Sequence, residues 1–363
     1  MKQLSVPRLA FLFAGCFLGA GFVSGQELWQ FFGCFGAWGF AGLAVSAVLF
    51  ALCGILLIRL AQISGVQELD ETVIRWKIPW LRHLMAFFQC LFLFSVVAIM
   101  VAGGGALVHQ LFAGIPAWCA SLVFGVLVIG LALRGLDGVA TAFSVCVPVI
   151  VVTTIAFAVA ALLYFGPERF AFAQTGSENP MLPCWQVAAV TYVAYNIFGS
   201  IGILTPFGEL VSSRKRVYQG ILLGTGLLVV IAVSVLASLS FFLDSTAAEM
   251  PMLELVCQMD RKLGYVYGLL LLFGIYGTAL SCGVALETYL SLRYTPVREH
   301  RTGVLIAMVA VAFAASLVGF GDLISTIYPV FGYLGALSLA LVFLNWLHYR
   351  KREKAAAKTG KNP

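Results

Sequence analysis

The residues with the strongest chemical signal lie inside the first apolar stretch of the chain. Residues 15–27 read GCFLGAGFVSGQE, and they place four glycines, a serine, a glutamine and a glutamate where a spanning helix normally carries aliphatic side chains. Glycine loosens a helix, and backbone groups freed at membrane depth need a partner from the protein, from water or from a ligand. Two interpretations stay open here: a broken helix that binds a ligand, and close helix packing through small residues.

A second stretch, residues 195–210 (YNIFGSIGILTPFGEL), repeats this pattern. Pro206 removes a backbone donor, so we expect the helix to kink or open there. Gly-Glu-Leu ends this stretch as Gly-Gln-Glu-Leu ends the first, so Glu209 corresponds to Glu27. Glycine-interrupted segments at matching positions of two oppositely oriented halves are typical of the binding site of a secondary transporter.

Composition fixes the class of protein in which these stretches lie. Of the 363 residues, 61% are hydrophobic and 10% are charged, which excludes a soluble globular domain. At about 20 apolar residues per span, the sequence predicts a single all-α polytopic membrane domain with ten spans. The expected spans cover residues 8–33, 36–61, 84–112, 115–133, 139–165, 185–211, 217–243, 263–292, 302–320 and 323–348.

The basic residues predict the orientation of these spans. With the N-terminus in the cytoplasm, all of the 22 Lys and Arg residues except Arg169, Arg261 and Lys262 fall on the inner side. This asymmetry predicts a multi-pass protein of the cytoplasmic membrane with both termini inside. The net charge of +6 therefore indicates contact with membrane lipids and no nucleic acid partner. Residues 349–363 form a basic cytoplasmic tail, which we expect to be disordered.

Polar residues in the eighth span could hold an ion. Thr278 and Ser281 share one helix face. Their hydroxyls could bind sodium together with carbonyls of an opened helix, or they could bond back to their own helix. Glu287 points to the opposite face near the cytoplasmic end, so we expect it to snorkel or to pair with a loop arginine.

The motif GAGFVSGQE at positions 19–27 resembles the YkvI-type family of bacterial membrane proteins. That family is similar to the amino acid–polyamine–organocation superfamily, which has a leucine-transporter-like fold. The resemblance implies a 5+5 inverted repeat, with residues 1–165 as the first half and residues 185–348 as the second. It also implies that helices 1 and 6 are broken at the midplane of the bilayer.

The resemblance implies roles for individual residues as well. The carbonyls of Gly15 and Leu18 would bind sodium with the two hydroxyls of the eighth span, and Arg8 resembles a cytoplasmic gate residue. Glu27 is uncommon in the sodium-coupled branch and leaves room for proton coupling, and Glu209 is its counterpart in coupling or gating. The residues expected to bind the solute are Gly19, Ala20, Gly21, Ser24, Tyr195, Asn196, Gly199, Ser200 and Gly202.

Together these features predict a secondary active transporter of an amino acid or similar small solute, coupled to sodium or protons. The alternative is a solute-sensing receptor of the same fold that does not transport. The sequence lacks a phosphate-binding GxxxxGK[ST] loop and an HExxH motif, so we expect neither an ATPase nor an enzyme, and no cofactor beyond the coupling ion. Solute identity, oligomeric state and a disulfide between Cys184 and Cys257 stay open.

Overall fold

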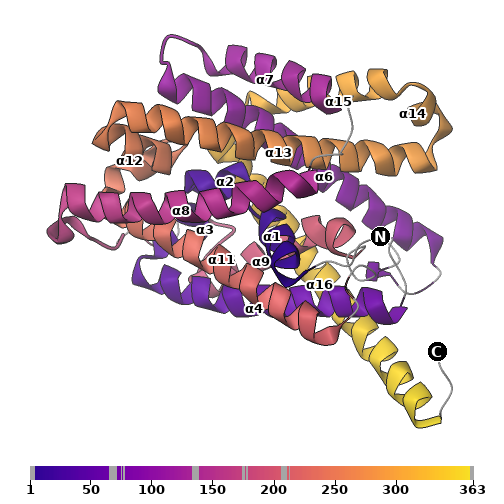
Figure 1. The fold of residues 1–363 in the computed structure, drawn as a ribbon. Helices are drawn as coiled ribbons and strands as arrows, with labels where there is room; N and C mark the ends of the chain where they lie inside the picture. The colour runs from indigo at the N-terminus through magenta and orange to yellow at the C-terminus, as the bar shows by residue number, and fades with distance from the viewer. Residues whose placement is uncertain are drawn as a thin grey trace.

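The computed structural model describes a chain that is helical wherever it has regular structure. The described residues are 5–64, 72–74, 76, 78–132, 139–173, 176, 179–205, 211 and 213–359. Long helices lie side by side in one bundle (Figure 1). They are α4 (Ala37–Ser64), α6 (Pro79–Leu111), α7 (Ala117–Ala132), α8 (Val139–Phe165), α9 (Trp185–Leu204), α11 (Arg214–Phe241), α13 (Arg261–Arg293), α15 (Arg301–Ser316) and α16 (Phe320–Thr359).

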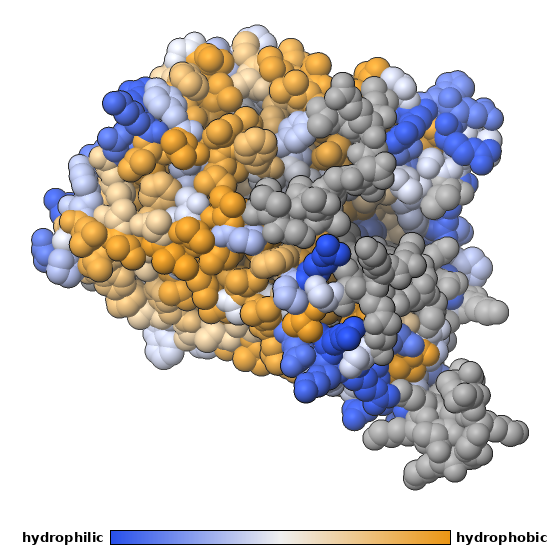
Figure 2. Space-filling model, viewed as in Figure 1, coloured by the Kyte–Doolittle hydropathy of each residue, from blue (hydrophilic) through white to orange (hydrophobic). Residues whose placement is uncertain are grey.

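Six of these helices, α4, α6, α8, α11, α13 and α16, contain stretches long and apolar enough to cross a membrane. The polytopic membrane class is therefore confirmed. Helices also fall on the other predicted spans, but α1 (Val6–Gly15), α7 and α15 have apolar stretches of only 10 to 17 residues. The count of ten spans accordingly remains a prediction. Figure 2 shows hydrophobic residues over much of the visible face and hydrophilic residues gathered toward its edges.

The first predicted span is divided into several short pieces. Helix α1 ends at Gly15, α2 covers Ala20–Ser24 and α3 covers Gln26–Phe31, before a 3-10 turn at Gly33–Phe35. The chain is not helical over residues 16–19, which lie within the glycine-rich stretch. Gly25, between α2 and α3, has a φ of +85°, a left-handed conformation that glycine adopts without steric cost.

The sixth predicted span differs from expectation. Helix α9 is continuous through Gly199, Ser200 and Gly202, so the expected unwinding at these residues is wrong. The hydroxyl of Ser200 forms its hydrogen bond within this helix, where Ser200 Oγ donates to Ile197 O at 3.0 Å. The helix ends at Leu204, and Thr205 after it still has helical φ and ψ of −61° and −42°, with its N–H bonded to Ile201 O. Pro206 and Glu209 lie outside the described residues.

The connections contain short helices. Residues 244–262 contain α12 (Pro251–Met259), whose apolar face is buried. The segment 62–83 is described only in part, and its residues Thr72 and Val73 are buried. Their carbonyls accept hydrogen bonds of 3.0 and 2.9 Å from Asn345 Nδ2. The basic tail is helical as far as Thr359, which corrects the expectation of disorder.

Packing places the divided first span in the centre of the bundle. Helix α1 packs against α8 and α11, and α2 packs against α13. Helix α3 contacts α9 and α16, which pack closely against each other. The interrupted segment therefore faces α13 on one side and the pair α9 and α16 on the other (Figure 1).

Candidate functional site

The interruption after α1 leaves backbone groups without partners among the described residues. Gly19 N–H donates to Phe17 O, only two residues earlier, at 3.0 Å. It therefore does not form the bond to the fourth preceding residue that an α-helix requires. The carbonyls of Gly15 and Leu18, both buried residues, accept no hydrogen bond from the part of the chain that the structure describes. Buried carbonyls are almost always paired, so these two are candidates for binding an ion or a polar ligand.

The start of α2 offers the complementary groups. Ala20 and Gly21 occupy its first two positions, where N–H groups have no partner within a helix. Their N–H groups donate no hydrogen bond to any other described residue. The interruption thus presents acceptors and donors a few residues apart, as the two charged ends of a zwitterion require.

Helix α13 places one of the two predicted hydroxyls, that of Thr278, beside this interruption. A Cβ placed on Gly19 would lie 4.0 Å from Thr278 Oγ1, so the two residues face each other. Thr278 Oγ1 donates to Gly274 O at 3.0 Å, and Ser281 Oγ donates to Gly277 O at 2.8 Å. Of the two roles left open for these hydroxyls, the bond back to their own helix is therefore present. A hydroxyl that gives its proton to a carbonyl keeps its lone pairs available for a cation.

Glu27 lies at the junction of α3, α9 and α16. Its side chain is buried, with 3% exposure, and its carboxylate accepts a hydrogen bond from Tyr195 Oη. Tyr192 and Asn196 are also neighbours of this carboxylate. The ring of Tyr328 from α16 stacks on Tyr195 at a centroid distance of 4.4 Å. Sequence reasoning found Glu27, Tyr195 and Asn196 but missed the other two tyrosines, although Tyr192 precedes Tyr195 by one helical turn.

Gly21 allows α2 to approach this carboxylate closely. A Cβ at this position would lie 2.8 Å from Glu27 Oε2 and 3.1 Å from Ile324 Cδ1. Both distances are shorter than an ordinary contact, so even alanine would displace a neighbour. Gly21 is therefore a packing residue whose lack of a side chain lets Glu27 reach its partners.

Ser24 and Asn196, which were also predicted to bind the solute, form hydrogen bonds with residues close to them in the chain. Ser24 Oγ, fully buried, donates to Gly21 O at 3.3 Å and accepts from Gln26 N–H at 3.4 Å, so it stabilises the turn at Gly25. Asn196 Nδ2 donates to Tyr192 O at 2.9 Å. These bonds give Ser24 and Asn196 structural roles. Asn196 also lies beside Glu27.

The remaining predicted residues are not brought to the interruption. Gly199 faces Phe92, whose Cζ would lie 3.1 Å from a Cβ at that glycine, so it serves the packing of α9 on α6. Gly202 is exposed. Arg8 is also exposed, and no ion pair joins it to the described residues.

A polar cavity of about 530 Å³ lies next to α3 and was missed by sequence reasoning. Gln26 and Gln30, one helical turn apart, line it together with Asp322 of α16. Gln30 Nε2 donates to Gly321 O at 3.3 Å, while the Oε1 atoms of both glutamines have no partner among the described residues. Glu27 follows Gln26 in the chain but is not among the residues that line this cavity.

Glu249 lines the same cavity from the connection before α12. Burial raises the pKa of its carboxyl, and the nearby Asp322 adds to this, although a hydrogen bond from the backbone of Phe320 and the proximity of His109 oppose it. The carboxyl of Glu249 in this cavity therefore keeps its proton to a higher pH than an ordinary glutamate.

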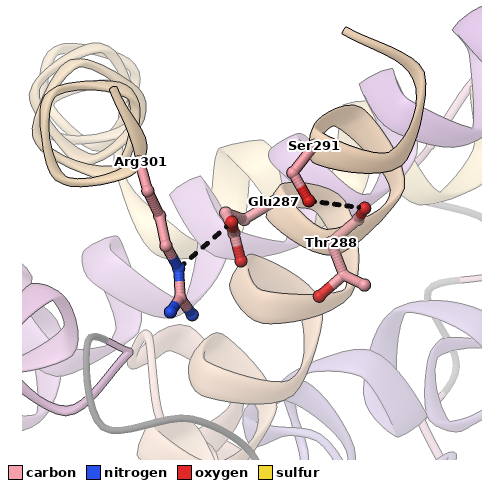
Figure 3. A network of polar contacts seen from close by, with 4 residues as sticks. All are labelled: Glu287, Thr288, Ser291 and Arg301. Atoms are coloured by element: carbon pink, nitrogen blue, oxygen red, sulfur yellow. Dashed lines mark hydrogen bonds and ion pairs between the residues drawn. The ribbon is translucent and has the colours of Figure 1, made fainter. Parts of the chain in front are cut away.

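Glu287 does not belong to the site, as expected. Its Oε1 lies 3.1 Å from Nε of Arg301, the first residue of α15, and the carboxylate side chain is almost fully buried (Figure 3). Ser291, one turn further along α13, donates to Thr288 O at 3.0 Å (Figure 3). The predicted pairing with a loop arginine is confirmed. Cys184 and Cys257 are both free, so the structure contains no disulfide between them.

Comparison with solved structures defines the fold. MhsT in complex with L-phenylalanine superposes with a TM-score of 0.69 at 17% identity, covering 94% of this chain and 89% of that one. A Na⁺-coupled sialic acid symporter gives 0.62 at 14% identity, covering 94% and 78%. A manganese transporter of Eremococcus coleocola gives 0.55 at 12% identity, covering 99% and 88%. The chain is thus a membrane protein with the leucine-transporter-like fold.

Comparison of sequences then identifies the family. The uncharacterized membrane protein YkvI of Bacillus subtilis is 30% identical over 343 residues, covering 93% of this chain and 94% of its own length. The uncharacterized protein YyaD of the same organism is 24% identical, covering 92% and 94%. No protein-family model matches the chain. The chain belongs to the YkvI family, as the motif at positions 19–27 indicated.

Proposed function

We propose that the chain is a secondary active transporter that moves an amino acid or similar small solute by alternating access. The observation that carries this proposal is the interruption at residues 16–19, where buried carbonyls and the first N–H groups of α2 have no partner among the described residues. Unpaired backbone at membrane depth is tolerated where it binds a ligand or borders water. Such an interruption is a recurrent feature of transporter binding sites.

The same groups favour a zwitterionic solute. The N–H groups of Ala20 and Gly21 suit a carboxylate, because the start of a helix carries partial positive charge. Carbonyls of the interruption suit an ammonium group. The similar structure of MhsT holds L-phenylalanine, which has both groups and supports this class of solute.

Two coupling ions fit the described residues. Sodium would take the carbonyls of Gly15 and Leu18 with the hydroxyls of Thr278 and Ser281, a set of hard oxygen ligands. A proton would take Glu27, whose described neighbours are hydroxyl and amide groups. Coupling to sodium is a property of the similar sialic acid symporter, which supports the first choice.

The proposal includes the predicted topology. It has ten spans in two inverted halves, both termini in the cytoplasm, and an opening of the sixth span beyond Leu204. Such a protein has no enzymatic reaction to perform. Glu209 would lie in this opening and act as the counterpart of Glu27.

The test begins with a thermal-shift screen of the purified protein against amino acids, polyamines and nucleobases, with and without sodium. A ligand that binds only the folded form raises the Tm. The ligand found is then labelled and offered to proteoliposomes under a sodium or a proton gradient. We expect accumulation driven by one of the gradients, whereas binding without accumulation would favour the receptor.

A further inference from the structure

Glu27 is a buried carboxylate that lacks a positive partner. Its side chain is 3% exposed, and the polar groups around it are the hydroxyls of Tyr192 and Tyr195 and the amide of Asn196. No ion pair joins it to a lysine, arginine or histidine in the part of the chain that the structure describes. A buried carboxylate is costly unless a proton or a positive charge compensates it. At Glu27 this compensation must come from a proton or from a ligand.

The carboxylate of Glu27 lies against the segment that follows the interruption. A Cβ on Gly21 would lie 2.8 Å from Glu27 Oε2, and Gly21 comes two positions after the interrupted residues 16–19. Tyr195 Oη donates its hydrogen bond to the other oxygen, Oε1. A carboxylate has about four acceptor positions, more than the three donors around it can fill. A solute bound at the interruption would therefore lie beside an acceptor that can still take a donor.

Aromatic rings beside this carboxylate favour an organic cation. The rings of Tyr195 and Tyr328 stack at a centroid distance of 4.4 Å, and Tyr192 meets Tyr195 edge to face at 5.6 Å. The face of a tyrosine ring attracts an ammonium or guanidinium group. A guanidinium is also more weakly hydrated than a compact ion, so it enters such surroundings at lower cost.

The polar cavity beside α3 is acidic as well. Glu249 and Asp322 line it, and no lysine, arginine or histidine is among the described residues that do so. Glu249 Oε1 and Asp322 Oδ2 would lie 3.3 and 3.9 Å from a Cβ on Gly319, so the two carboxyl groups converge. The predicted topology places this cavity on the outer side of the membrane. An acidic entrance raises the local concentration of cations, so it favours the same class of solute.

On the basis of the function proposed above, we infer that the solute is a basic amino acid whose ammonium or guanidinium side group forms an ion pair with Glu27. The interruption holds the end that all amino acids share, and Glu27 binds the charged end that distinguishes the basic ones. Glu27 is then the residue that determines specificity. Sodium, at the hydroxyl of Thr278, is left as the coupling ion.

The test measures the binding of matched amino acids to the purified full-length protein by isothermal titration calorimetry in the presence of sodium. Arginine is compared with citrulline, which has nearly the same shape without the charge, and lysine with norleucine. Removing one partner of a buried charge pair lowers affinity roughly thirtyfold or more. We therefore expect arginine and lysine to bind about thirtyfold more tightly than their neutral counterparts.

Two variants assign this preference to Glu27. Glu27→Gln keeps the shape of the side chain and an oxygen that can accept from Tyr195. It should lower the affinity for arginine by about thirtyfold and leave that for citrulline unchanged. Glu168→Gln removes the same charge at an exposed position that does not line the cavity, so both affinities should stay as in the wild type.

Several results would overturn the inference. In the wild type, where the folding of a variant plays no part, these are equal affinities within each matched pair, or no binding of arginine and lysine. Others are an unchanged preference in Glu27→Gln, and an equal loss in Glu168→Gln, which would indicate diffuse surface charge. Uptake in proteoliposomes tests the transporter separately. Arginine that binds through Glu27 without accumulating would refute transport and keep the inference, whereas gradient-driven uptake of neutral amino acids alone would support transport and overturn the inference.

Discussion

Gly21 provides a sharp test of how closely α2 approaches Glu27. In Gly21→Ala, the new methyl group would lie 2.8 Å from Glu27 Oε2 and 3.1 Å from Ile324 Cδ1. Overpacking of this kind costs about 1–3 kcal/mol. Displacing the carboxylate from Tyr195 adds the loss of a hydrogen bond, roughly 1.5–3 kcal/mol if the group is charged. Alanine recovers only about 1 kcal/mol through its higher helix propensity.

The clash and the lost hydrogen bond together outweigh the propensity, and Gly21→Ala should lose about 1.5–5 kcal/mol of stability. In a thermal unfolding assay, at roughly 2 °C per kcal/mol, this corresponds to a fall in Tm of about 3–10 °C. Gly226→Ala in α11 is the control, because a Cβ there meets nothing within 4 Å. Its Tm should be unchanged or higher.

A double-mutant cycle identifies the cause of the loss. In the Glu27→Ala background the carboxylate is absent, so the cost of Gly21→Ala should shrink by about 1 kcal/mol or more. If Gly21→Ala proves as harmless as Gly226→Ala, or if its cost is the same with and without the carboxylate, the described contact is wrong.

Three further outcomes are expected. Thr278→Ala and Ser281→Ala should each raise the sodium concentration for half-maximal uptake in proteoliposomes; an unchanged sodium response would remove these hydroxyls from the site. Glu27→Gln should shift the pH profile of uptake if protons are coupled, and an unaltered profile would indicate a structural acid. Burial raises the pKa of Glu249, so folding favours its neutral carboxyl. The neutral carboxyl therefore contributes to stability below the ordinary glutamate pKa of about 4.3, and this contribution is lost as the pH rises from there through the raised pKa of the folded state. Glu249→Gln should therefore reduce the fall in Tm over this range, and an equal fall in the variant and the wild type would contradict this role of Glu249.

Much of the fold could be predicted because hydrophobicity alone determines where helices form in a membrane. The break in the first span was predicted as well, since glycines at 15, 19 and 21 weaken a helix that lacks other support. The same reasoning predicted a break at Gly199, Ser200 and Gly202, where α9 is continuous. Gly199 is tolerated within α9 because the ring of Phe92 packs against it, and such a contact is invisible in one sequence.

The candidate site was harder to predict than the fold. Glu27 stood out as an acid in an apolar segment, but its partners come from residues far away in the chain. Tyr328 approaches through α16, and its ring lies on Tyr195 only because α9 and α16 pack together. The pairing of Glu287 with Arg301 was predictable, since both residues are near the same predicted loop.

The most direct test of the account is gradient-driven uptake in proteoliposomes by the wild type and by Gly19→Leu. Gly19 has an ordinary extended conformation, and a Cβ there meets Thr278 only at 4.0 Å, so the variant should fold. Its longer side chain would extend toward Thr278 of α13. We predict that the wild type accumulates the labelled solute under a sodium or proton gradient, and that the variant keeps its Tm but loses uptake. Wild-type uptake by Gly19→Leu, or binding without accumulation by the wild type, would contradict the account.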